Sequence, residues 1–75
     1  MSFLVIGNCR WGHGDDLATA KKNFKAQGGQ LSLGYTIVEF AADQEFTGVD
    51  PMGYVHWKGN RADPVSTEVK PRKSR

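Results

Sequence analysis

Residues 7–29, GNCRWGHGDDLATAKKNFKAQGG, are the stretch of this 75-residue chain in which a helix, its start and its end can all be predicted. Asp15 or Asp16 offers an N-cap, because a carboxylate at that position accepts a hydrogen bond from a free amide and suits the positive end of the helix dipole. An apolar stripe at helical spacing follows, formed by Leu17, Ala20 and Phe24. A Gly pair at residues 28–29 then provides a left-handed C-cap. We predict a helix over residues 16–27.

The helix is preceded by a short apolar run, FLVI at residues 3–6. Both alternating faces of this run are apolar, which is typical of a strand covered on both sides. Gly7 ends the run, and Gly12 and Gly14 permit turn conformations. We therefore expect a glycine-rich turn between this strand and the helix.

Two further strands are predicted after the helix, over residues 35–41 and 54–58, because apolar and polar side chains alternate in both segments. The turn signature Asp50-Pro51-Met52-Gly53 between them indicates a hairpin. In the second strand, Val55 and Trp57 share one face, and the other face carries Tyr54, His56 and Lys58. Residues 62–75 contain few apolar side chains, and we expect them to be extended or disordered.

The predicted fold is therefore α+β, with two layers in the order β-α-β-β. A right-handed crossover would pair the first two strands in parallel, and one helix would cover a three-stranded mixed sheet. We expect one small domain at residues 1–60 and a flexible basic tail at residues 61–75. The second face of the sheet would be bare or covered by another subunit, and it would then expose aromatic side chains, which on small proteins indicate an interface.

The single cysteine indicates a reducing compartment, and the charged residues are distributed unevenly along the chain. Cys9 is the single cysteine, and the sequence has no Asn-x-Ser/Thr acceptor, so we expect a cytoplasmic protein. The apolar run at residues 3–6 is too short for a signal peptide or a membrane span. Residues 61–75 have a net charge of +3, whereas residues 1–60 have a net charge of −1. The basic character belongs to the tail, which favours phosphate groups or simply solvation.

Several chemistries can be tested against the motifs and are not favoured. The glycine-rich stretch lacks the Gly-Lys-Ser/Thr ending of a Walker loop and the third small residue of the dinucleotide fingerprint. A set of Cys9, His13, Asp15, Asp16 and His56 has no recognisable zinc spacing. Pairs such as Cys9 with His13 resemble a nucleophile and its base, but such pairs occur by chance in short chains. We expect a non-enzymatic protein with no catalytic, cofactor-binding or metal-binding residues.

Aromatic and cationic side chains are interleaved in a way that suits binding. Single-strand nucleic-acid binders combine stacking rings with phosphate contacts, although no RNA-recognition or zinc-finger signature is present. Either Trp11 or Trp57 could instead close a small hydrophobic core. The candidate interaction residues are Arg10, Trp11, Tyr35, Tyr54, His56, Trp57, Lys58, Arg61, Lys70, Arg72, Lys73 and Arg75.

The segment WGHGDDLATAKKNF at residues 11–24 resembles small, uncharacterised proteins encoded by phages and prophages. In these, a Trp-Gly-x-Gly-Asp turn opens a short helix, and a Gly pair and a Tyr-x-Val hairpin follow, as at residues 28–29 and 35–38 here. The match covers about a third of the chain and brings no assigned activity with it. The resemblance implies a cytoplasmic accessory protein of an infected bacterium that binds a host or phage macromolecule.

These observations lead to two functional hypotheses. The first is an interaction module that binds a host or phage protein, or a second copy of itself as a homodimer, through an aromatic sheet face. The alternative is a nucleic-acid-binding protein that uses the basic tail and the end of the domain formed by Arg10, Trp11, Trp57 and Lys58.

Overall fold

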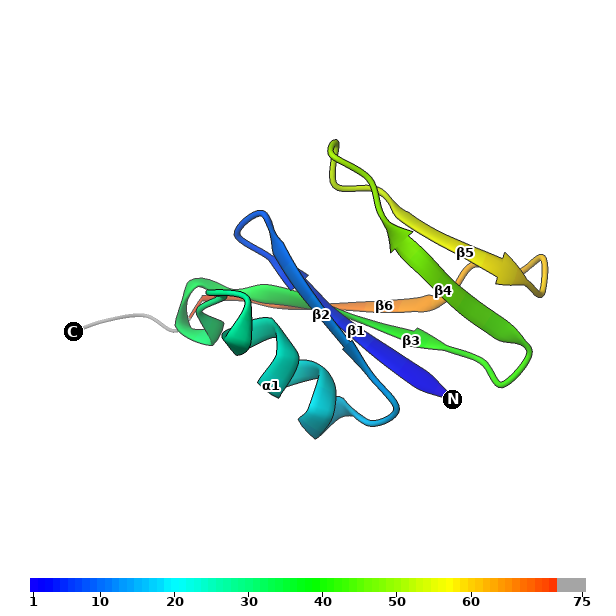
Figure 1. Ribbon diagram of the computed structural model, residues 1–75, viewed down its shortest axis with the longest axis horizontal. Helices are drawn as coiled ribbons and strands as arrows, with labels where there is room; N and C mark the ends of the chain where they lie inside the picture. The colour runs from blue at the N-terminus through cyan, green and yellow to red at the C-terminus, as the bar shows by residue number, and fades with distance from the viewer. Residues whose placement is uncertain (72–75) are drawn as a thin grey trace.

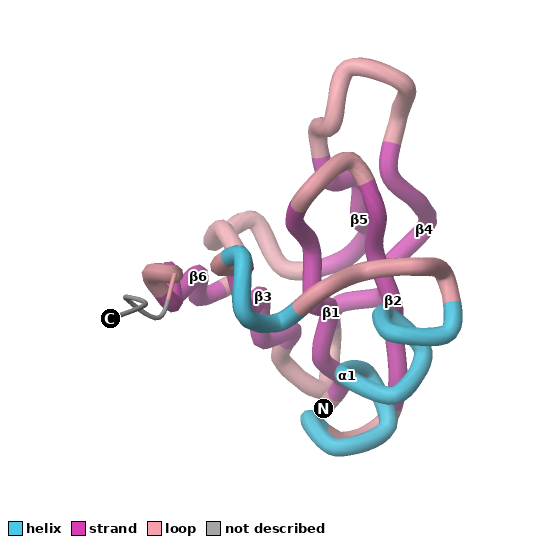
Figure 2. The backbone as a smooth tube through the Cα atoms, turned by 90° about the vertical axis from the view of Figure 1, so that its left-hand side faces the viewer, coloured by secondary structure: helices cyan, strands magenta, loops and turns pink. Residues whose placement is uncertain are grey.

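The fold is α+β, and the computed structural model describes residues 1–71. Over this range a four-stranded sheet in the order β2-β1-β3-β6 lies between a helix and a two-stranded ribbon of β4 and β5 (Figures 1 and 2). The elements are β1 (Ser2–Gly7), β2 (Arg10–Gly14), α1 (Leu17–Ala26), the 3-10 helix η1 (Leu31–Leu33), β3 (Tyr35–Phe40), β4 (Gln44–Val49), β5 (Val55–Gly59) and β6 (Val65–Val69). The α+β class is confirmed, whereas the three-stranded sheet is wrong.

The glycine-rich segment forms a strand, β2, and not the expected turn. The chain reverses within two residues, Asn8 and Cys9, which both have positive φ and lie between the paired residues Gly7 and Arg10. Gly12 then faces α1 so closely that a Cβ would clash with the backbone of Asn23 and Phe24. The glycines of β2 thus let the helix approach the sheet.

The helix and both of its caps are confirmed. Asp16 is the N-cap, and its Oδ1 accepts a hydrogen bond from the Thr19 amide at 2.7 Å, which lowers the pKa of the carboxyl. At the other end, Gly28 has a φ of 94° and donates to the Lys25 carbonyl, and Gly29 donates to the Phe24 carbonyl. This pair of bonds is the Schellman arrangement.

Strands β1 and β3 are antiparallel, so the predicted parallel crossover is wrong. The physical reason is β2, which carries the chain back along β1 before the helix begins. The helix therefore returns the chain to the far end of the sheet, and β3 enters in the opposite direction to β1. Under the helix, Val5, Ala20 and Phe24 form one buried cluster.

The second face of the sheet is covered by the ribbon β4–β5 of the same chain. Leu4, Val38 and Phe40 form a buried cluster there, and the ribbon packs against it with its own apolar side chains, Phe46, Val49, Val55 and Trp57. The predicted hairpin between strands 35–41 and 54–58 is wrong, because β4 lies between them and is the strand that pairs with β5. No second subunit is needed to cover this face.

The C-terminal segment is ordered as far as the structure describes it. Over Val65–Val69 the chain forms β6, which pairs with β3, so the expectation of a disordered tail is wrong for these residues. Buried Gln44 holds the connection to β6 in place, because its Nε2 donates to the Ala62 carbonyl at 2.6 Å and its Oε1 accepts from the Ala41 amide. The predicted tail cations Arg72, Lys73 and Arg75 lie outside the described residues.

Candidate interaction site

A groove of about 380 Å³ lies between the tips of two hairpins, β1–β2 and β4–β5. The β1–β2 turn supplies one wall, and the β4–β5 turn supplies the other. The lining residues are Ile6, Cys9, Arg10, Trp11, Val49, Asp50, Pro51, Met52 and Gly53. The groove therefore joins two segments that are about 40 residues apart in the sequence.

Asp50 holds the β4–β5 turn in its shape. Its Oδ1 accepts hydrogen bonds from the amides of Met52 and Tyr54, both at 2.9 Å, and its Oδ2 lies 3.0 Å from Nε2 of His56. The contact with His56, followed by the Tyr54 amide, lowers the pKa of the Asp50 carboxyl. A single carboxylate thus fixes one wall of the groove.

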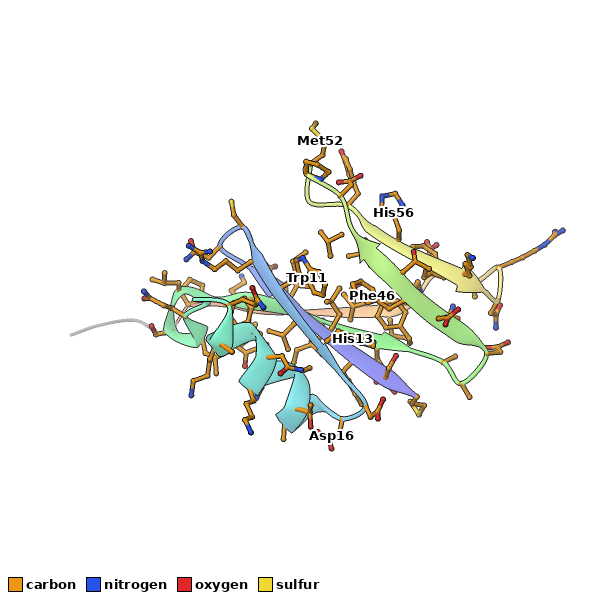
Figure 3. The ribbon with its side chains drawn as sticks, in the orientation of Figure 1. Trp11, His13, Asp16, Phe46, Met52 and His56 are labelled. Carbon is orange, nitrogen blue, oxygen red and sulfur yellow. The ribbon has the colours of Figure 1, made fainter. Side chains whose placement is uncertain are left out.

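Large apolar side chains reach solvent around this groove. Met52 is 79% exposed, Trp11 is 38% exposed, and Tyr54, next to the turn, is 66% exposed. Figure 3 shows Met52 at the tip of the ribbon and Trp11 beside the ribbon on β2. Flexible Met and broad Trp side chains are both typical of binding surfaces.

Beneath the groove, the ribbon is attached to the sheet through aromatic rings (Figure 3). The ring of Phe46 lies 5.2 Å from that of Trp11, 4.7 Å from that of His13 and 5.7 Å from that of Phe40, centroid to centroid. Nε2 of His13 is buried and has no hydrogen-bond partner within residues 1–71. Burial lowers the pKa of His13, and the nearby charge of Asp15 opposes this shift.

The predicted interaction residues do not form one aromatic face. Trp57, on β5, packs against the buried cluster between the ribbon and the sheet, whereas Tyr35 packs on the helix side of the sheet. The exposed residues Tyr54, His56 and Lys58 do alternate with Val55 and Trp57, as the pattern predicts. Lys58 pairs with Glu45 near the far end of the ribbon from the Asp50–Gly53 turn, and it does not line the groove that contains Arg10 and Trp11. Arg61 is exposed in the connection between β5 and β6.

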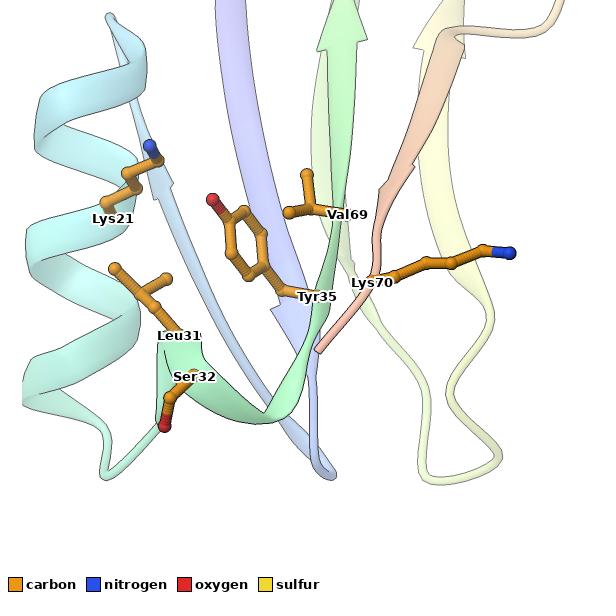
Figure 4. Close-up of a pocket in the computed structure, with 6 residues that line it drawn as sticks. All are labelled: Lys21, Leu31, Ser32, Tyr35, Val69 and Lys70. Atoms are coloured by element: carbon orange, nitrogen blue, oxygen red, sulfur yellow. The ribbon is translucent and has the colours of Figure 1, made fainter. Parts of the chain in front are cut away.

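A second hollow of about 440 Å³ lies between α1, η1, β3 and the end of β6 (Figure 4). It is lined by Lys21, Leu31, Ser32, Tyr35, Val69 and Lys70. Nζ of Lys21 is 5.7 Å from the centre of the Tyr35 ring, a cation–π arrangement. Two of the predicted interaction residues, Tyr35 and Lys70, therefore come together with a lysine of the helix that was not selected from the sequence.

The candidate groups for metal or nucleophilic chemistry are spread over different parts of the molecule. Cys9 is exposed in the β1–β2 turn, His13 packs on aromatic rings, and His56 contacts Asp50 on the ribbon. Within residues 1–71, no group of three His, Cys, Asp or Glu side chains is arranged to hold a metal ion. In the same range, no helix is long and apolar enough to cross a membrane.

Of the groove residues, only Arg10 and Trp11 were predicted as interaction residues; Val49 and Met52 were missed because their segment reads as a polar connection. The strand signal of β4 is hidden by a bulge between Phe46 and Gly48, which lets Phe46 and Val49 face the same core although they are three residues apart. The turn residues Asp50 and Pro51 are the sequence signal that could have located these groove residues, because they predict a hairpin tip.

Comparisons with protein-family models, curated proteins and solved structures find no match to this chain.

Proposed function

We propose that this chain is a small non-enzymatic interaction module that binds another protein through the groove between its two hairpin tips. The observation that carries the proposal is the exposure of Met52 and Trp11 at the rims of an apolar groove. Because exposed apolar surface is costly in water, such a groove indicates a partner that covers it.

The groove also suggests how a partner is oriented. Ile6 and Val49 contribute apolar lining and Asp50 contributes a negative charge, whereas the guanidinium of Arg10 lies beside Gly28 at the end of α1. Side chains inserted into such a pocket dominate binding energy, and charges at the rim favour one orientation. We propose an apolar anchor on the partner, with a cationic residue on the Asp50 side. The phage resemblance suggests a host or phage protein in the cytoplasm of the infected cell.

Met52→Asp is the variant that tests this proposal, because Met52 is exposed and contributes little to the core. Leu33→Asp is the matched control, since Leu33 is also an exposed apolar residue, 51% accessible, and lies in η1 away from the groove. Full-length bait in a nuclease-treated host lysate should retain a specific protein, identified by mass spectrometry. Met52→Asp should lose that protein, and Leu33→Asp should retain it. Equal retention by both variants, or no specific capture by the native chain, would refute the proposal.

Nucleic-acid binding is the second candidate, and one observation favours it. Nζ of Lys21 lies 5.7 Å from the centre of the Tyr35 ring, and Lys70 lines the same hollow with its side chain directed away from the ring (Figure 4). Three more cations follow Lys70 in the sequence, at residues 72, 73 and 75. A ring beside cations is the combination that stacks a base and contacts its phosphate. In this nucleic-acid hypothesis, the hollow at Tyr35 is the binding site, in place of the site predicted from the sequence at Arg10, Trp11, Trp57 and Lys58.

Neutralising only residues 72, 73 and 75 with Gln tests this candidate without removing β6. Binding to a labelled single-stranded oligonucleotide, followed by fluorescence anisotropy, should weaken, and the salt slope should fall by about 2 if all three contact phosphates. Lys70→Gln should weaken binding as well, whereas Lys22→Gln, on the exposed side of α1, should change it little. Absence of binding by the native chain at low salt would exclude the candidate.

A further inference from the structure

The four-stranded sheet has two edges, and they differ in how they are protected. At the β2 edge, the side chain of Asn23 on α1 donates from Nδ2 to the His13 carbonyl at 2.7 Å. His13 lies opposite Leu4, three residues beyond Arg10 of the hydrogen-bonded pair that flanks the tight turn, so its carbonyl points away from β1. The helix therefore occupies the outer edge of β2.

The β6 edge carries no such protection within the described chain. Residues 65–68 are all exposed, and β6 pairs with β3 alone. Natural edge strands are usually blocked by short length, charged side chains, a proline, a bulge or a covering element. The five-residue segment Val65–Val69 has one charged side chain, Glu68, but no lysine, proline or bulge, and its ladder with β3 is regular over all five residues. Its free edge can therefore accept another strand.

The sequence of β6, VSTEV, is complementary to itself in the antiparallel direction. With a two-fold axis at Thr67, Val65 lies opposite Val69 of the second copy, and Ser66 lies opposite Glu68. Apolar pairs and Thr–Thr pairs of this kind stabilise sheets. An axis at Glu68 would instead oppose two like charges, which disfavours that register. Pro64 and Pro71 flank the strand and limit pairing to this segment.

The sheet surface beside β6 is also open. The helix packs mainly on β2 and β1 and meets β3 at Tyr35, whose ring lies 6.4 Å from that of Phe24, so the part of this face around Val65 and Ile37 is less covered. Val65 on this face is 65% exposed, and Ile37 and Val69 are half-buried. Pairing of β6 with a second β6 would join two such surfaces into one apolar floor between two helices. Main-chain hydrogen bonds and apolar contacts would then act together.

We propose that two copies of this chain associate through antiparallel pairing of their β6 strands about a two-fold axis at Thr67. The product is a continuous eight-stranded sheet with both helices on one side. The groove between the hairpin tips takes no part in this contact, so the inference is independent of the proposed function and can fail without it.

Oligomeric state tests the pairing directly, by analytical ultracentrifugation over a range of concentrations. The native chain should show a monomer–dimer equilibrium. Val65→Lys should weaken the dimer about tenfold, because symmetry places the change at two pairs, and Leu33→Lys should leave it unchanged. Ser66→Lys should tighten the dimer, since each new cation faces Glu68 of the second copy. Circular dichroism establishes that each variant is folded. A native chain that is monomeric at its highest soluble concentration overturns the proposal, as does an equal response to Val65→Lys and Leu33→Lys.

Disulfide trapping tests the register, and it is done in a Cys9→Ser background because Cys9 is itself exposed. Directly opposed residues have Cα atoms about 4.5–5.5 Å apart, which a disulfide can span. Thr67→Cys should therefore form a covalent dimer rapidly under mild oxidation. Ser66→Cys should not, because the two Ser66 Cα atoms would lie about 8 Å apart across the axis. Equal cross-linking rates at the two positions would refute this register.

Discussion

The imidazole of His13 stacks on the ring of Phe46, with centroids 4.7 Å apart and planes 23° apart. His13 lies on β2 and Phe46 on β4, so this pair connects the edge of the four-stranded sheet to the ribbon. The ribbon in turn carries Met52, at the rim of the groove. The protonation state of one side chain is thus coupled to the packing of the element that forms a wall of the candidate site.

Acid should loosen this contact. Burial lowers the pKa of His13 in the folded chain, whereas the unfolded chain takes up the proton near the ordinary pKa of about 6.5. The unfolded state therefore binds more protons, and stability rises with pH. The His13 contribution should be complete above about pH 6.5, and it should be lost as the pH falls below that value toward the folded pKa.

Urea unfolding at several pH values measures how the free energy of unfolding changes with pH. His13→Phe keeps a ring on Phe46 and removes the titration, so its slope between the two pKa values should be flatter. His56→Gln, on the exposed face of the ribbon, is the control that should retain the His13 contribution. If His13→Phe retained the full native slope, the pH dependence would have another source.

The ribbon should depend on Phe46 more than on any exposed side chain. Phe46→Ala removes ring contacts with Trp11, His13 and Phe40. We expect a loss of about 2 kcal/mol, below the ~3–5 kcal/mol of a fully buried Phe, because Phe46 is half-buried. Hydrogen exchange should increase first in β4 and β5. Tyr54→Ala should stay within about 0.5 kcal/mol of the native chain, and an equal effect of the two variants would contradict this packing.

The helix could be predicted almost to the residue because its signals are local. Asp16, the stripe ending at Phe24 and the Gly pair each act within one or two turns of the helix. The alternation of Val55 and Trp57 with polar neighbours likewise predicts which side chains of β5 face the core. These predictions required no knowledge of tertiary contacts.

The strands that were missed depend on contacts distant in sequence. Trp11-Gly12-His13-Gly14 alternates large and small residues at a period of two, but the glycines suggest a turn unless the helix packed on them is known. β6 has few apolar residues and is a strand because β3 offers it a partner. The groove could not be predicted either, since it exists only where two hairpin tips meet.

The close approach of α1 to β2 should make Gly12 sensitive to a single methyl group. A Cβ at Gly12 would meet the backbone of Asn23 and Phe24, which cannot move without displacing the helix. We expect Gly12→Ala to cost roughly 3 kcal/mol, at the upper end for overpacking. Gly7→Ala meets its nearest neighbour, the Gly34 carbonyl oxygen, at 3.0 Å and should cost less. Thermal unfolding compares the two, and a similar loss for both would show that the helix can shift.

The β4–β5 turn should lose its order when the acceptor at Asp50 is removed. Asp50→Ala leaves the amides of Met52 and Tyr54 without their acceptor and ends the contact with His56. Asp50→Asn keeps an acceptor oxygen on the side chain and should preserve most of the turn. Because the hydrogen bonds lower the pKa of Asp50, the native turn should be intact at neutral pH and lose order as the pH falls below about 3.8.

Amide hydrogen exchange at Met52 and Tyr54 is the direct measurement of this prediction. Exchange at both positions should be faster in Asp50→Ala than in the native chain, and close to native in Asp50→Asn. If Met52 binds a partner as proposed, Asp50→Ala should also weaken that binding, because a wall of the groove becomes mobile before the partner arrives and must be ordered on binding. Unchanged exchange in Asp50→Ala would mean that the Gly53–Asp50 and Asp50–Tyr54 backbone bonds hold the turn without the carboxylate.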